Sequence, residues 1–134
     1  MNTFHLQIVT PDGCAFDGEA EELLVKTSEG YVGILAKHLD YAATLVVGEA
    51  VVTSGGKPRR AACGGGFLSV ASGEVTMVVT TFEYAENIDL ARAAAAQAKA
   101  ESRMQAARDA EEYAAAKAKL MRALTRQQVA GVQR

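Results

Sequence analysis

The sequence has few of the residues that build metal, redox or membrane sites. Only two Cys and two His occur among 134 residues. Cys14 and Cys63 lack the CxxC spacing of zinc and redox sites, so we expect small buried thiols in a reducing compartment. His5 and His38 are too isolated for a metal site. No apolar run approaches the roughly 20 residues of a membrane helix, and the N-terminus lacks signal-peptide features. A soluble, intracellular protein is predicted.

Patterns typical of catalysis are also missing. The sequence has no readable Ser-His-Asp or Cys-His arrangement, and its carboxylates show no pairing that spacing alone justifies. Gly64-Gly65-Gly66 is not followed by GK[ST], and Phe67 begins a predicted strand rather than a helix. A bulge or a close strand approach is therefore favoured over a phosphate loop. The chain is predicted to be no enzyme.

Glycine is absent from a long stretch near the C-terminus. Eleven of the twelve glycines lie at or before Gly73, and the next is Gly131. The first part consists of short apolar runs separated by turn residues, whereas the second is alanine-rich and studded with charges. We therefore predict an α+β chain, with a β-sandwich of about ten short strands over residues 1–86 and a helical region over residues 87–134.

Alternation and turn residues place the elements. Phe4, Leu6 and Ile8 indicate a strand with one face inward, and a break is expected at Gly48-Glu49. Further strands are expected around 23–27, 33–35, 45–47, 50–53, 67–70 and 75–81, with a hairpin loop at 54–58.

The helical region is predicted to form an antiparallel two-helix hairpin. Asn87 is the expected N-cap of a first helix that runs to about Ala106, and residues 108–110 form the expected turn. A second helix from about residue 111 to 129 places one packing face on Tyr113, Ala116, Leu120 and Leu124. This face is narrow and mostly alanine, so the hairpin is expected to dock weakly.

Charge is divided unevenly along the chain. Residues 1–86 hold five Lys or Arg against eleven Asp or Glu, whereas residues 87–134 hold nine against five, which gives −6 and +4. The signs alternate along the tail and its only aromatic residue is Tyr113, so base stacking and nucleic-acid binding are disfavoured. An acidic protein surface or a nucleotide is the expected partner.

Five segments, in this order and spacing, resemble the epsilon subunit of bacterial F-type ATP synthase. They are residues 6–13, 16–21, 27–38, 65–70 and 85–93. The resemblance implies a β-sandwich followed by a helical hairpin, a place on the rotor between the gamma subunit and the ring of membrane proteolipid c subunits, and a coupling role rather than a catalytic one. It further implies a peripheral position on the cytoplasmic face of the bacterial cell membrane.

The resemblance also implies contact residues on the sandwich. The loop of His38, with Glu29 and Gly30 nearby, matches the family's contact with the ring. An exposed turn histidine without such a role is the alternative. Family members commonly have proline where this chain has Ala36 and Asp40, which changes the expected rigidity of the loop.

For the hairpin, the resemblance implies regulation. The helices can fold against the sandwich, or extend along gamma toward the catalytic beta and alpha subunits and hinder ATP hydrolysis. Some members bind ATP in the folded state, although no cofactor is required. The matching positions are Ile88, Asp89, Arg92, Ala93, Lys99, Arg122 and Arg126.

Alternative interpretations remain for these positions. Asp89 with Arg92 also fits an ordinary i,i+3 ion pair, and Arg122 with Arg126 fits a solvated face. Lys99 stands where ATP-binding relatives tend to carry Arg, and it lacks the bidentate fork. If these positions bind no nucleotide, the chain is a structural stalk subunit. A further alternative is an unrelated sandwich adaptor with a helical tail.

Overall fold

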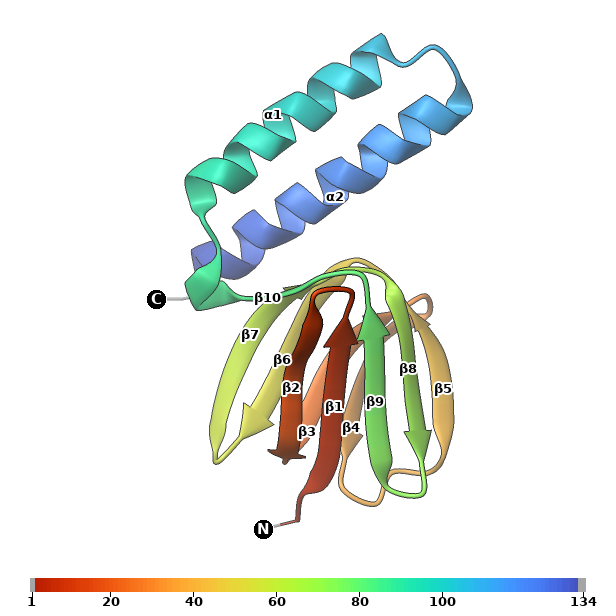
Figure 1. Cartoon of the computed structure of the whole chain (residues 1–134), viewed down its shortest axis with the longest axis vertical. Coiled ribbons are helices and arrows are strands. Elements are labelled where there is room, and N and C mark those ends of the chain that lie inside the picture. Colours follow the sequence, from red (N-terminus) through yellow and green to blue (C-terminus); the bar gives the residue numbers. More distant parts are fainter. Residues whose placement is uncertain (1, 133–134) are drawn as a thin grey trace.

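Ten strands precede two long helices in the computed structural model, which describes residues 2–132 (Figure 1). The sandwich strands are β1 (Phe4–Thr10), β2 (Gly13–Ala20), β3 (Glu22–Thr27), β4 (Gly30–Leu35), β5 (Tyr41–Leu45), β6 (Gly48–Ser54), β7 (Lys57–Cys63), β8 (Gly66–Ala71), β9 (Glu74–Val79) and β10 (Phe82–Tyr84). A 3₁₀ turn, η1 (Ala85–Asn87), leads into helices α1 (Leu90–Ala106) and α2 (Ala110–Val132). The predicted fold class is confirmed.

The strands form one continuous sheet that folds over into a sandwich (Figure 1). Its order is β10-β7-β6-β3-β5-β8-β9-β1-β2, and β4 pairs with β3. β1 lies parallel to β9, and the other pairings given for the described strands are antiparallel. Strands far apart in the sequence therefore lie side by side at the centre of each layer.

Large aliphatic side chains fill the space between the layers. Phe4, Leu6 and Ile8 of β1 are buried while the residues between them are not, which confirms the predicted alternation. They pack with Leu23, Ile34, Leu68 and Met77, among others. Each fully buried Leu, Ile or Met contributes about 1.5–3 kcal/mol, so this core holds the sandwich together.

Gly66 marks a close approach between β8 and β9. A Cβ atom at this position would lie 1.9 Å from the carbonyl oxygen of Val78. Only glycine fits such a contact, so the predicted close strand approach is confirmed. Gly64 is similarly confined, beside the hydroxyls of Thr80 and Thr81.

Two local predictions for the sandwich were wrong. The break between β5 and β6 falls at residues 46–47, and Gly48 begins β6, because the chain crosses β3 there: the N–H of Val46 donates to the carbonyl of Lys26 at 3.1 Å. Cys14 is exposed on β2, where it was expected to be buried. Cys63 is buried as predicted, and burial raises the pKa of its thiol to about 12.

Helix α1 begins two residues later than predicted. Asn87 belongs to the 3₁₀ turn, and Asp89 is the N-cap: its Oδ1 accepts the N–H of Arg92 at 3.1 Å. The chain breaks between the helices as expected. Asp109 Oδ1 accepts the N–H of Glu112 at 2.8 Å, and the Glu112 carboxylate accepts the N–H of Arg108 at 2.9 Å.

The two helices pack through alanine. Ala93 and Ala100 of α1 are buried, as are Ala116 and Ala123 of α2. Ala116 was predicted correctly and Leu120 is partly buried, but Tyr113 and Leu124 are 45% and 38% exposed. Alanine lets the helices approach closely, so the larger side chains lie outside the seam.

The hairpin rests on the sandwich through the last turns of α2, and its tip points away (Figure 1). Val129 is buried in a small cluster with Ala62, Ala85 and Ile88. Arg126 adds an ion pair to Glu83 of β10. None of the helices within residues 2–132 is long and apolar enough to span a membrane.

Candidate functional site

A cavity of about 400 Å³ lies where the hairpin leaves the sandwich. The 3₁₀ turn, the first turns of α1 and the end of α2 meet around it. Five of the seven positions assigned to nucleotide binding line it: Ile88, Asp89, Arg92, Ala93 and Arg126. Glu83, Asn87 and Ala96 complete the lining.

Within this junction cavity the two arginines differ in their bonding. Arg126 Nε donates to Glu83 Oε1 at 3.0 Å, so its guanidinium is held but keeps further donors. Arg92 has no ion pair among the described residues. Asp89 bonds the backbone N–H of Arg92 and caps the helix, in place of the alternative i,i+3 ion pair. The Arg92 guanidinium is therefore available for an anion.

The remaining two predicted positions lie outside the cavity. Arg122 is one turn before Arg126 and borders a much smaller space with Val47, Ala62 and Cys63. Lys99 is exposed, seven residues along α1 from Arg92. The structure thus brings five of the predicted residues together and leaves two beside them.

Glu83 is a member of the cavity that the sequence did not reveal. It pairs with Arg126, which is 43 residues away in the chain. No local spacing signals such a pair, because only the return of α2 to the sandwich brings the two groups together.

An aromatic and ionic contact fixes the 3₁₀ turn that precedes the cavity. The Arg59 guanidinium lies 3.6 Å from the ring centre of Tyr84 and is bonded to the carboxylate of Glu86. This bond lowers the pKa of Glu86. Ile88 and Asp89 follow directly, so the contacts of Arg59 fix the backbone just before α1 begins.

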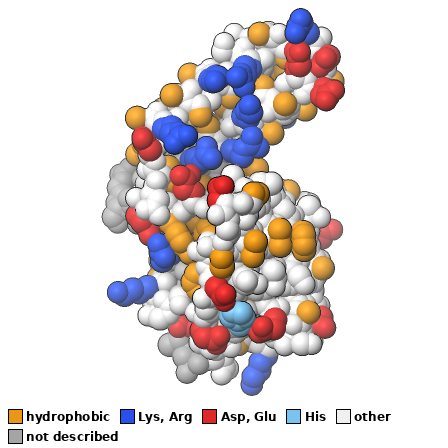
Figure 2. All heavy atoms as spheres, viewed as in Figure 1, with side chains coloured by type: hydrophobic (Ala, Val, Ile, Leu, Met, Phe, Trp, Pro, Cys, Tyr) orange, Lys and Arg blue, Asp and Glu red, His pale blue; other side chains and the backbone are white. Residues whose placement is uncertain are grey.

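Lys and Arg side chains gather over the hairpin and above its junction with the sandwich (Figure 2). At the junction cavity, Glu83 of β10 and Asp89, the N-cap of α1, supply carboxylates, and Arg92 of α1 and Arg126 of α2 supply guanidiniums. Within residues 2–132 no group of three or more His, Cys, Asp or Glu is placed to hold a metal ion. The cavity lining is neutral overall, and Arg92 is its cation without an ion pair among the described residues.

The structure separates the residues expected to contact the ring. Glu29 lies in the β3–β4 turn and Gly30 begins β4; Thr27 Oγ1 accepts the N–H of Glu29 and donates to the carbonyl of Gly30 at 2.7 Å. His38 lies beyond the far end of β4, after Leu35. Five residue steps of extended strand span about 17 Å, so His38 and Glu29 lie at opposite ends of β4, and their contact with the ring stays a prediction.

The His38 loop is ordered without the two prolines. Asp40 Oδ1 accepts the N–H of Ser72 at 3.0 Å, which ties the loop to the β8–β9 turn. His38 Nδ1 donates to the carbonyl of Leu39 at 2.7 Å, and its ring contacts Tyr41 edge-on. Lys37 adopts a φ of 65°, so the turn is tight.

A β-sandwich joined to an alanine-packed helical hairpin, with a cavity lined by residues of both, defines a class of two-part α+β proteins. Residues 3–85 match the family model described as ATP synthase, Delta/Epsilon chain, beta-sandwich domain, and residues 86–131 match the corresponding long alpha-helix domain. The chain belongs to the ATP synthase delta/epsilon chain family.

Relatives cover almost the whole chain. An ATP synthase epsilon chain from Ruminococcus albus is 38% identical over 131 residues, which is 97% of this chain and 98% of the relative. One from Halalkalibacterium halodurans is 37% identical over 132 residues, or 98% and 99%. A chain in the Euglena gracilis mitochondrial ATP synthase shares the fold, with a TM-score of 0.76 and 24% identity over 89% of this chain and 76% of that one.

Proposed function

We propose that this chain is the epsilon subunit of an F-type ATP synthase, a non-catalytic part of the central stalk that couples ring rotation to the catalytic head. Full-length relatives named ATP synthase epsilon chain support this role. The fold is shared with a chain in the central stalk and c-ring of the Tetrahymena thermophila enzyme, at a TM-score of 0.67 and 15% identity over 94% of this chain and 95% of that one.

In this role the sandwich binds the gamma subunit and the ring of c subunits, at the cytoplasmic face of the bacterial membrane. Phe67 and Val78 are cross-strand partners on β8 and β9 and are 51% and 38% exposed. Figure 2 shows exposed hydrophobic side chains on this side of the sandwich. Such a patch suits a protein partner. The His38 loop, at one end of β4, is the proposed ring contact, and the Glu29-Gly30 turn is a separate candidate at the other.

The hairpin is the proposed regulatory part. Within the described residues, its docking on the sandwich includes the buried Val129 and the ion pair of Arg126 with Glu83. Small contacts of this kind are reversible, so the helices can leave the sandwich and reach the beta and alpha subunits, where basic side chains hinder ATP hydrolysis.

ATP is the proposed ligand of the docked hairpin, and the grouping of Ile88, Asp89, Arg92, Ala93 and Arg126 around one cavity carries this proposal. The Arg92 guanidinium binds phosphate oxygens, and Asp89 accepts from the adenine amino group. Because residues from both helices and from β10 line the cavity, bound ATP favours the docked state by mass action.

Calorimetric titration of the full chain with ATP tests the ligand. We expect saturable binding that Arg92→Gln weakens by about tenfold or more, since a charged hydrogen bond to phosphate is lost. Lys117→Gln is the matched control, because Lys117 is exposed on α2 and does not line the junction cavity. No saturable binding up to millimolar ATP leaves a structural stalk subunit without a nucleotide site.

Reconstitution tests the stalk role separately. We expect the chain to co-purify with gamma and to lower the ATP hydrolysis rate of an epsilon-depleted catalytic head. Failure to bind gamma would instead indicate a sandwich adaptor outside the rotor, whatever the result with ATP.

A further inference from the structure

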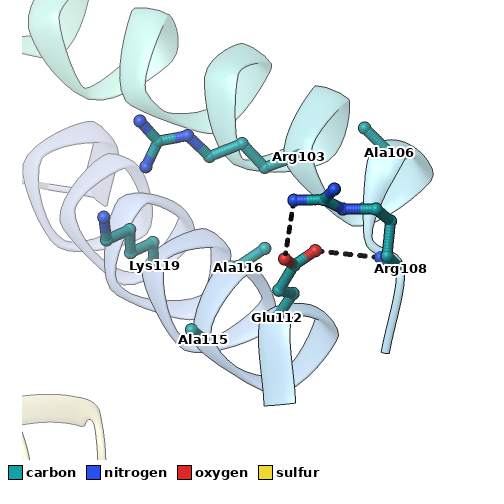
Figure 3. A pocket seen from close by; sticks show the side chains of 7 residues that line it. All are labelled: Arg103, Ala106, Arg108, Glu112, Ala115, Ala116 and Lys119. Carbon is teal, nitrogen blue, oxygen red and sulfur yellow. Dashed lines mark hydrogen bonds and ion pairs between the residues drawn. The ribbon is translucent and has the colours of Figure 1, made fainter. Parts of the chain in front are cut away.

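A second cavity, of about 330 Å³, lies at the tip of the hairpin, at the opposite end from the junction cavity (Figure 3). It shares no lining residue with the junction cavity. Arg103 comes from the last turns of α1, Arg108 from the turn between the helices, and Lys119 from α2. Three cations therefore converge on one hollow, and Glu112 is its one acidic lining residue.

Arg103 and Lys119 extend from opposite helices over the same groove (Figure 3). Neither has an ion pair or a side-chain hydrogen bond to another residue in the described part of the chain. Nearby carboxylates are engaged elsewhere: Glu101 accepts from Gln97, and Asp109 caps α2. The two cations across the groove therefore lack a partner of opposite charge.

Arg108 lines the other side of the hollow, and its side chain is 87% exposed. Its N–H donates to Glu112 Oε2 at 2.9 Å, and its Nη2 lies 3.5 Å from Glu112 Oε1. A guanidinium has five N–H donors, so this contact leaves donors free. Glu112 offsets one of the three positive charges, so the lining of the cavity carries a net charge of +2.

Alanine forms the floor of this tip cavity. Ala106, Ala115 and Ala116 line it, and Ala116 is 4% exposed. Their methyl groups create depth between the helices and offer no competing polar group. A compact ligand with several negative oxygens can lie on this floor and receive donors from both helices at once.

We propose that the tip cavity binds the phosphate chain of a small phosphorylated molecule. Arg103 and Lys119 clamp successive phosphate groups from opposite sides, and Arg108 binds a terminal oxygen. Cations that face one another across a hollow suit a compact polyanion, whereas an extended acidic peptide needs cations in a row. This site does not depend on the proposed ATP site, because Arg92 and Arg126 are at the other end of the helices.

Titration of the full chain with sodium tripolyphosphate, followed by amide NMR at low salt, tests the site. We expect saturable shifts at Arg103, Ala115, Ala116 and Lys119. Arg103→Gln and Lys119→Gln each raise the dissociation constant by about fivefold or more, because each removes a charged hydrogen bond. Both side chains are exposed, so these variants keep the fold, which circular dichroism verifies.

Controls separate this site from general attraction to a basic helix. Lys117→Gln and Arg92→Gln leave the tip shifts within about twofold, whereas raising the salt to 0.15 M weakens binding without changing which amides shift. If a nucleotide supplies the phosphate chain, ATP produces the same shifts at the tip amides and adenosine produces none. If an inorganic chain is the ligand, tripolyphosphate produces these shifts and ATP does not.

Three outcomes would overturn the proposal. The first is the absence of saturable tip shifts up to about 10 mM tripolyphosphate, a concentration at which even weak specific sites fill. The second is an equal loss of binding in Lys117→Gln and Lys119→Gln, which indicates unspecific charge. The third is tighter binding of a hexaglutamate peptide to the same amides, which assigns the cavity to an acidic protein segment.

Discussion

The sandwich and the hairpin bury different kinds of side chain. Leu6, Ile8, Leu68 and Met77 fill the sandwich, whereas alanines form the seam between the helices. Each large side chain removes much more apolar surface from water than an alanine does. The comparison teaches that the sandwich is held by much more buried apolar surface than the hairpin, so the hairpin is the less firmly packed part of this chain.

Charges are used differently in the two parts as well. In the sandwich they join strands to neighbouring elements, as in the pairs of Arg60 with Glu49 and His5 with Asp17. In the hairpin, Arg92, Arg103 and Lys119 have no ion pair among residues 2–132. Charges that fix strands contribute to the fold, and unpaired cations remain available to anions.

The largest expected effect is a loss of stability of the sandwich. Gly66→Ala lowers the free energy of unfolding by about 3 kcal/mol, at the upper end of the cost of an extra carbon in a packed core. The reason is that the new Cβ lies 1.9 Å from a carbonyl oxygen of β9, which must move. Thermal or urea unfolding measures the loss.

Gly18→Ala is the matched control for that change. Gly18 lies on β2 in ordinary contact with Phe16, and its φ is not positive. We expect it to change stability by less than about 0.5 kcal/mol, as most surface changes do. Equal losses in both variants would contradict the close approach of β8 and β9.

A smaller effect is expected at the hairpin. Val129→Ala removes two buried carbons where α2 meets Ala62 and Ala85, which weakens docking by about 1.5 kcal/mol. Hydrogen exchange of α2 amides then accelerates about tenfold while the sandwich melts at an unchanged temperature.

Met121→Ala controls for side-chain size on the same helix, because Met121 is 43% exposed. It should leave exchange in α2 nearly unchanged. If Val129→Ala instead lowers the melting temperature of the whole chain, the two parts unfold together and their independence is refuted.

The smallest effect depends on pH. His5 Nε2 is 2.6 Å from Asp17 and Nδ1 is 3.1 Å from Glu74, and these carboxylates raise the pKa of His5. Its folded pKa is higher than the unfolded value of about 6.5, so its stabilisation is fully present below that pH and is lost as pH rises through the folded pKa. The melting temperature of the chain should therefore exceed that of His5→Gln at pH 5.5 and match it at pH 9. A difference that is constant with pH would contradict this account.

Local patterns predicted the helix break well and one helix start less well. Residues 108–110 combine charge with a capping Asp, and the structure places the break one residue earlier, at residues 107–109. Asn87 and Asp89 are both good caps, and choosing between them required the contacts of the 3₁₀ turn with β7. Spacing alone could not decide which of two capping residues begins the helix.

Helical periodicity placed Ala116 correctly in the seam but also placed Tyr113 and Leu124 there. The seam that forms uses Ala123 instead, because two alanine faces pack more closely than any face with a large side chain. Likewise, Glu29 and His38 are close in sequence but lie at opposite ends of β4. An extended strand places the residues at its two ends far apart, and the pairing of β3 with β4 shows that residues 30–35 form such a strand.

By itself, the sequence determined the two-part architecture, the separation of charge and the run of residues from Ile88 to Ala93. These features are local, because glycine and alanine content, alternation and capping act over a few neighbouring residues. Tertiary structure alone decided that Glu83 meets Arg126, that Cys14 stays exposed while Cys63 is buried, and that Arg103 faces Lys119 across the hairpin tip. Each of these depends on which distant surfaces come together, and that is set by the packing of the whole chain.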